Sequence, residues 1–155
     1  MFGIYTGKRY IINKFVEFEM PIGEKNHKIK VPNNILNNKK LYKSFLRGLF
    51  DTGGCIHFEK SYNKNASKWQ KEKHHIPKVA ITTVSKELST QIAQMFQTIG
   101  LKFSVRTIKP YKNNSEAYRI ESKGKKRVKT FFSKIKPKNS RHIKKFEKWL
   151  SQGFY

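Results

Sequence analysis

Hydrophobic residues recur at helical spacing in four segments of this chain. From Asn38 to Thr52 the apolar positions fall three or four residues apart, which predicts an amphipathic helix with Leu41, Phe45, Leu46, Leu49 and Phe50 on one side. Segment 85–100 repeats the pattern with Leu88, Ile92, Met95, Phe96 and Ile99. Two further helices are predicted at 125–136 and 140–150. Pro137 lies between them and prevents one continuous helix.

Between these helices, apolar and polar residues alternate with a period of two. The segments 55–62, 76–84, 101–108 and 116–122 are therefore predicted to be strands of two hairpins. One face of the resulting antiparallel sheet is apolar and packs on the helices: Ile56, Phe58, Val79, Ile81, Phe103, Val105, Tyr118 and Ile120. The opposite face is polar, with Lys, Arg, Glu, His, Ser and Thr side chains.

The N-terminal part carries another alternating pattern. Residues 9–19 and 27–31 are predicted to be two strands, joined by a turn that contains Pro21 and Gly23. The predicted organisation is a β-hairpin extension over 1–31 and a single α+β domain over 32–155.

Charge narrows the class of partner. The 155 residues include 34 Lys and Arg against 10 Asp and Glu, a formal charge of +24, and 14% of the residues are aromatic. Such self-repulsion disfavours the compact state, so a polyanionic partner is the simplest explanation. Nucleic acid is favoured over an anionic membrane surface, its rival.

Other classes of protein are disfavoured by composition. No apolar run approaches the ~20 residues of a membrane span, and no secretory signal pattern opens the sequence. Cys55 is the single cysteine, so no internal disulfide or thiolate metal cluster is expected. We expect a cytoplasmic, nucleoid-associated protein that is not secreted.

The polar sheet face is the candidate surface for reading DNA, although a plain solvated face is the alternative. A major groove admits a two-stranded ribbon, acidic side chains can accept from cytosine, and lysines at the hairpin tips can contact phosphates. The predicted DNA contacts are His57, Glu59, Ser61, Asn63, Lys64, Lys68, Lys78, Thr82, Lys102, Ser104, Arg106, Lys109, Lys112, Arg119 and Glu121.

One residue does not suit the first helix. Gly48 lies within its apolar face and costs about 1 kcal/mol relative to alanine. The stretch that contains it, FLRGLFDTGGCI, resembles the signature of the LAGLIDADG homing endonucleases over residues 46–54. The preceding VPNNILNNKKLYKSFLRGLFD resembles archaeal members in particular, and the resemblance extends over about residues 32–150.

The resemblance implies an αββαββα fold with a saddle-shaped antiparallel sheet that binds DNA, and an intron-encoded, site-specific double-stranded DNA endonuclease. Members with one signature act as homodimers on near-palindromic sites, and a small residue at Gly48 lets two signature helices approach closely. The implied dimer interface comprises Phe45, Gly48, Leu49 and Thr52. Residues 1–31 would be the remnant of a longer ancestor.

The sequence departs from the family at its metal site. Gly53 occupies the position of the acid that binds Mg²⁺, whereas Asp51 matches the first acid of the signature. Asp51, Thr52 and Gly53 are the implied metal-site positions, and Asp51, Gly53, Lys138 and Ser85 the implied catalytic ones. Lys138 is chosen over its neighbours Lys136 and Arg141, and Thr83 is the alternative to Ser85. Ser85 has an alternative role as a helix N-cap, and Lys138 one as a phosphate contact. We expect DNA binding with little or no cleavage.

Two other functions stay open. The same fold can serve as a DNA-binding regulator without nuclease activity, or as a maturase that binds intron RNA. Lys144, Lys145 and Lys148 in the last predicted helix permit RNA binding without arguing for it. Whether Gly53 is natural, and whether Asp51 can substitute for the missing acid, is also open at the level of sequence.

Overall fold

The computed structural model describes residues 7–17, 27–60, 74–109 and 115–154. The helices are α1 (Arg9–Glu17), α2 (Asn33–Leu36), the short 3-10 helix η1 (Lys39–Leu41), α3 (Tyr42–Gly53), α4 (Lys86–Thr98), α5 (Lys125–Ile135) and α6 (Ser140–Gln152). The strands are β1 (Gly54–Lys60), β2 (His74–Thr83), β3 (Ser104–Ile108) and β4 (Ala117–Lys123). From α3 onward this order confirms the predicted α+β fold.

The four strands form one antiparallel sheet in the order β1-β2-β4-β3. The two hairpins meet through β2 and β4, where Val79 pairs with Ser122 and Ile81 with Ile120. Successive side chains point to opposite faces, so this register fixes one apolar face and one polar face for the whole sheet.

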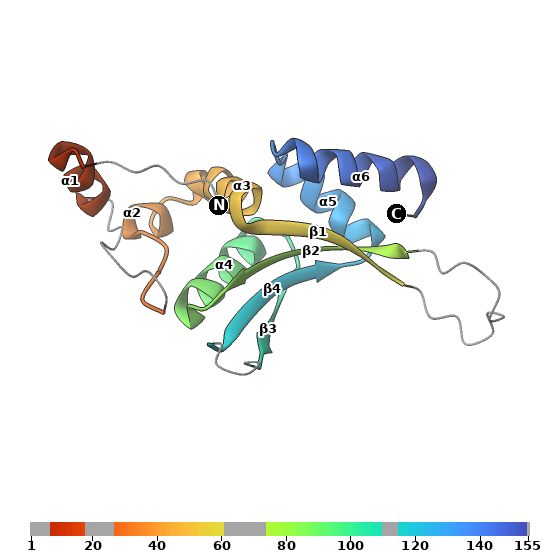
Figure 1. Ribbon diagram of the computed structural model, residues 1–155, viewed down its shortest axis with the longest axis horizontal. Coiled ribbons are helices and arrows are strands. Elements are labelled where there is room, and N and C mark those ends of the chain that lie inside the picture. The colour runs from red at the N-terminus through yellow and green to blue at the C-terminus, as the bar shows by residue number, and fades with distance from the viewer. Residues whose placement is uncertain (1–6, 18–26, 61–73, 110–114, 155) are drawn as a thin grey trace.

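The helices α3, α4, α5 and α6 contact the sheet and cover its apolar face (Figure 1). Ile56, Val79, Ile81 and Ile120 are almost fully buried there. Aromatic rings join the helices to one another: the ring of Phe132 in α5 stacks on that of Phe146 in α6, and the rings of Phe50, Phe96 and Phe131 meet in the centre. None of the helices in the described part of the chain is long and apolar enough to cross a membrane.

One residue of the predicted apolar sheet face is exposed. Val105 pairs with Ile120 and so points to the apolar face, but 41% of it stays accessible to solvent. It belongs to the edge strand β3 and lines an open hollow beside α4. Phe103 just before β3 is half-buried, with its ring stacked 3.9 Å from that of Phe96 in α4.

The N-terminal β-hairpin prediction is wrong in the described residues. Residues 9–17 form the helix α1, which has no buried residue and lies at one end of the molecule (Figure 1). Residues 27–31 form no strand, because their backbone contacts α4 instead. The carbonyl of Ile29 accepts from the Ser85 hydroxyl at 2.5 Å, and the N–H of Val31 donates to Gln91 Oε1 at 2.7 Å.

Candidate nucleic-acid interface

The polar face of the sheet lies opposite the helices. The register places on it Cys55, His57 and Glu59 of β1, Lys78, Ala80 and Thr82 of β2, Arg119, Glu121 and Lys123 of β4, and Ser104, Arg106 and Ile108 of β3. The described helices contact the sheet from its apolar side, so none of them covers this face.

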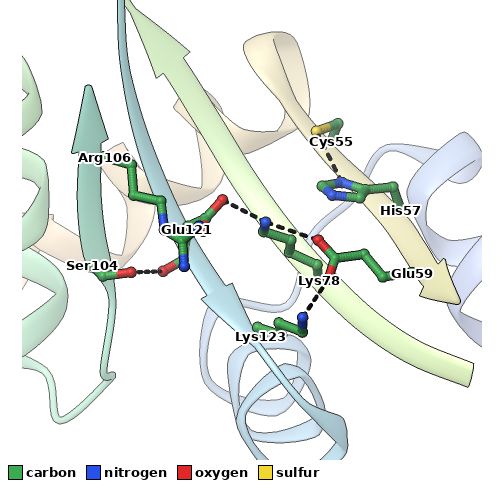
Figure 2. Close-up of polar contacts among 8 residues, drawn as sticks. All are labelled: Cys55, His57, Glu59, Lys78, Ser104, Arg106, Glu121 and Lys123. Atoms are coloured by element: carbon green, nitrogen blue, oxygen red, sulfur yellow. Dashed lines mark hydrogen bonds and ion pairs between the residues drawn. The ribbon is translucent and has the colours of Figure 1, made fainter. Parts of the chain in front are cut away.

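Five charged side chains on this face form a chain of ion pairs across all four strands, which we call the charge ladder (Figure 2). Lys78 Nζ lies at its centre, 2.7 Å from Glu121 Oε2 and 3.0 Å from Glu59 Oε1. The second oxygen of Glu121 contacts Arg106 Nε at 3.0 Å, and the second oxygen of Glu59 contacts Lys123 Nζ.

The side chains at the centre of the charge ladder are buried, whereas those at its ends are exposed. The side chains of Lys78 and Glu121 are 8% and 4% exposed, whereas those of Arg106 and Lys123 are 71% and 48% exposed. Hydrogen bonds from Lys123 and Lys78 lower the pKa of Glu59 to about 2. Burial alone would lower the pKa of Lys78, but its bonds to Glu121 and Glu59 outweigh this and raise it. Glu59 and Lys78 are therefore both charged at neutral pH.

This arrangement changes the role expected for the two glutamates. Both oxygens of Glu59 and both of Glu121 contact cationic side chains, so neither carboxylate is poised to accept from cytosine. The two glutamates instead hold cations in place on the face. Lys123 is a member of this face that the sequence analysis missed, although the alternation through Arg119 and Glu121 extends to it.

The other predicted contacts on the sheet differ in their surroundings. Thr82 is exposed on β2, and the Ser104 hydroxyl donates to the carbonyl of Glu121 at 3.4 Å. His57 is half-buried with Nδ1 3.7 Å from Cys55 Sγ, and burial, followed by the charge of Lys78, lowers its pKa. Arg119 is half-buried, and its Nε has no hydrogen-bond partner in the part of the chain that the structure describes.

The predicted DNA contacts outside the strands do not all lie on the polar face. Lys109 is exposed just after β3. Lys102 does not join the polar face: it lines a cavity of about 320 Å³ with Lys126 and Arg127 of α5, on the helical side of the molecule. Ser61, Asn63, Lys64, Lys68 and Lys112 lie outside the described residues.

The end of α3 is anchored to the two C-terminal helices. Arg47 Nε donates to the carbonyl of Ile135 at the end of α5, at 2.7 Å. Four residues later, the Asp51 carboxylate accepts from the backbone N–H groups of Lys138 and Asn139, just before α6. The predicted catalytic residue Lys138 thus touches Asp51 through its backbone, while its side chain is on the exposed surface.

The predicted metal-site residues do not fit a Mg²⁺ ion as they stand. The two oxygens of Asp51 hold the start of α6, and the Thr52 hydroxyl donates to the carbonyls of Gly48 and Leu49 within its own helix. Gly53 contributes no side chain. Within the described residues no group of three His, Cys, Asp or Glu side chains could hold a metal. Mg²⁺ strongly prefers carboxylate and water oxygens, and this chain offers no carboxylate here that is free of fold contacts.

Ser85 has the structural role that was its alternative interpretation. Its side chain is fully buried, accepts from the N–H of Leu88 as the N-cap of α4, and donates to the carbonyl of Ile29. Its hydroxyl is therefore committed to the fold and does not reach the surface where a DNA backbone would lie.

The predicted dimer-interface residues share one exposed side of α3. Gly48 and Thr52 are exposed, and Phe45 and Leu49 are half-buried. A Cβ atom built on Gly48 meets no atom within 4 Å, so nothing in the described part of one chain requires glycine at this position. Gly54 differs, because a Cβ there would lie 2.3 Å from Cδ2 and 2.7 Å from the carbonyl oxygen of Phe50.

Residues 40–136 match the LAGLIDADG-like domain family, which is more than half of the chain. The chain belongs to the LAGLIDADG family. The match spans α3, both hairpins, α4 and α5, the elements that build the polar sheet face and the anchored end of α3. Membership in the LAGLIDADG family thus confirms the resemblance seen in FLRGLFDTGGCI; its archaeal character stays a prediction.

One solved structure similar to this LAGLIDADG chain is the group I intron-encoded homing endonuclease I-CeuI complexed with DNA. The two share 11% sequence identity with a TM-score of 0.42, and the alignment covers 82% of this chain and 53% of that one. The chain thus spans about half the length of that protein. No curated protein sequence matches the chain.

Proposed function

We propose that this protein binds double-stranded DNA site-specifically as a homodimer, through the polar face of its sheet, on a LAGLIDADG endonuclease scaffold whose cleavage activity is impaired. The observation that carries the proposal is the charge ladder, which presents Arg106 and Lys123 in fixed positions on a face that no described helix covers. Ordered cations on an antiparallel ribbon suit the major groove, where base edges carry sequence information.

The net charge of the chain supports DNA as the partner. A formal charge of +24 attracts a polyanion over long distances and releases counterions on contact. Site-specific recognition needs polar side chains with defined geometry in addition to charge, and the sheet face supplies them.

The exposed side of α3 supports homodimer formation. Gly48 weakens the helix by about 1 kcal/mol without an intramolecular reason for its presence, since a Cβ there meets open space. Close packing of α3 against α3 of a second copy would use the small residue. A two-fold dimer of this kind matches a near-palindromic DNA site.

Gly53 is the reason to propose impaired cleavage. Phosphodiester hydrolysis on this scaffold is expected to need Mg²⁺, and residue 53 is where the family resemblance places its carboxylate ligand. Loss of that ligand from both subunits weakens both metal positions, at a cost of roughly 10³-fold or more in rate. A regulator that binds without cutting is the alternative function, and it would use the same DNA-binding face.

Binding measurements with a matched pair of variants test the DNA-binding part. Thr82→Glu places a negative charge in the middle of the polar face, whereas Thr90→Glu makes the same change at an exposed position of α4, on the helical side of the sheet. We expect Thr82→Glu to weaken binding to duplex DNA roughly tenfold, and Thr90→Glu to have little effect. Equal losses would place the DNA elsewhere. Tighter binding of wild type to structured RNA than to duplex DNA would favour the RNA maturase function.

A further inference from the structure

The ends of the charge ladder differ from its centre in what they can contact. Glu59, Lys78 and Glu121 satisfy one another within the face, and Glu121 and Lys78 are nearly inaccessible. Arg106 and Lys123 each give one contact to the ladder and expose much of the remaining side chain. The buried centre therefore serves to fix the two outer cations, which are the members able to reach a partner.

Arg106 contacts Glu121 but stays accessible to a partner. Its Nε lies 3.0 Å from Glu121 Oε1, and 71% of the side chain is exposed to solvent. Guanine presents two acceptors, O6 and N7, side by side in the major groove, and two parallel N–H donors of one arginine match them. Lysine, a point charge, does not match this pair of acceptors in the same way.

The charge ladder also reduces the conformational entropy that Arg106 loses when it binds DNA. A free arginine loses rotamer freedom when it binds a base, but one already held through Nε has lost part of it in the unbound protein. Glu121 can do this because Lys78 neutralises its second oxygen at 2.7 Å and keeps the carboxylate fixed in the sheet. The neighbouring Ser104 hydroxyl, which bonds the Glu121 carbonyl, reinforces the same position.

We infer that Arg106 is a specificity-determining residue that recognises guanine in the major groove, and that Glu121, held by Lys78, is its positioning residue. This inference rests on the proposed function, since it assumes that the polar face meets duplex DNA. In a two-fold dimer, the guanine occupies one equivalent position in each half-site. Lys123 is held by Glu59 but carries a single ammonium group instead of a planar guanidinium. It therefore adds electrostatic attraction to DNA without selecting a base.

Selection of bound duplexes from a randomised pool tests this inference, with wild type, Arg106→Lys and Glu121→Gln compared at one salt concentration. We expect Arg106→Lys to reduce the preference for guanine at one position per half-site by about tenfold to a hundredfold. Its affinity for mixed-sequence duplex and the salt dependence stay close to wild type, because the charge is kept. Since Arg106 is 71% exposed, this variant leaves the fold intact.

Glu121→Gln tests the positioning role. It should weaken the guanine preference at the same position, and the double variant should lose no more than Arg106→Lys alone, because both act through one contact. Lys123→Ala is the control: it lowers affinity evenly across sequences. A mere structural role for Glu121 would instead reduce affinity for all duplexes alike.

The outcomes separate the two levels of the argument. Duplex binding with no guanine preference in wild type, or with the preference unchanged in Arg106→Lys, overturns the inference and leaves the proposed function standing. If wild type retains no duplex from the pool, the proposed function fails and the inference fails with it. A loss confined to one symmetric pair of guanines is the result that supports both.

Discussion

The carboxylate of Asp51 holds the backbone of Lys138, 87 residues away in the sequence. The N–H of Lys138 donates to Oδ1 at 3.1 Å and Oδ2 at 3.0 Å, and the N–H of Asn139 donates to Oδ1 at 3.2 Å. The side-chain amide of Asn139 returns a 2.7 Å bond to the Asp51 carbonyl. The first acid of the signature therefore joins the end of α3 to the start of α6.

Removing this carboxylate should destabilise the protein. Asp51→Ala leaves two backbone N–H groups without their acceptor at the entry to α6, at a cost of about 2 kcal/mol in unfolding free energy. Asp51→Asn keeps one acceptor oxygen and should cost less. Urea denaturation followed by circular dichroism measures the difference. If Asp51→Ala were as stable as wild type, the anchoring role would be refuted.

Sequence periodicity predicted most of the fold, because the elements from α3 to α6 combine a strong pattern with clear ends. Ser85 and Asn139 act as N-caps, and Gly100 and Gly153 follow helices with positive φ. The residues that end each element are thus local in sequence, so a local pattern suffices to find them.

The features that the sequence analysis did not anticipate depend on distant contacts. Residues 9–17 fit a short strand pattern as well as a helical one, and the choice between the two depends on whether a partner strand lies beside them. Glu121 stays a predicted DNA contact, but its pairing with Lys78 depends on the β2–β4 register, which the sequence does not reveal. The need for glycine at residue 54 likewise depends on packing, because the Phe50 ring and carbonyl lie where a Cβ of Gly54 would be.

The two adjacent glycines should respond differently to the same substitution. Gly54→Ala forces its Cβ against the Phe50 ring and carbonyl oxygen, and the backbone atom cannot yield easily, so we expect a loss of about 2 kcal/mol or more. Gly53→Ala, whose Cβ meets open space, should be neutral within about 0.5 kcal/mol. Thermal unfolding of both variants checks this, and equal losses would contradict the assigned role of Gly54.

Gly48→Leu should separate dimer formation from folding. The side chain enters open space in one chain but would keep two α3 helices apart, so the dimer should weaken at least tenfold while the subunit stays folded. Lys43→Leu, about 140° around the same helix, is the control for added apolar surface. Sedimentation velocity measures the change. An unchanged dimer in Gly48→Leu, or a monomeric wild type, would exclude α3 as the interface.

The contribution of Glu59 should depend on pH in the acid range. Its pKa is lowered from 4.5 to about 2, so the folded state holds the charged form more strongly than the unfolded chain does. The stabilisation is complete above about pH 4.5 and is lost as pH falls toward 2. Glu59→Gln should therefore lower stability by about 1 kcal/mol at pH 7 and much less at pH 2. An equal loss at both pH values would argue against the ion pairs as its cause.

Restoring a carboxylate at residue 53 tests the central claim most directly. Gly53→Asp adds a side chain where a Cβ meets open space, and Gly53→Asn adds one of the same shape without charge. Wild type and both variants are compared for Mg²⁺-dependent cleavage of a plasmid library that carries randomised sites. The account predicts that only Gly53→Asp cuts, with a rate roughly 10³-fold or more above wild type. Cleavage by wild type at the same rate would contradict it, because the scaffold would then be active without the acid that it lacks.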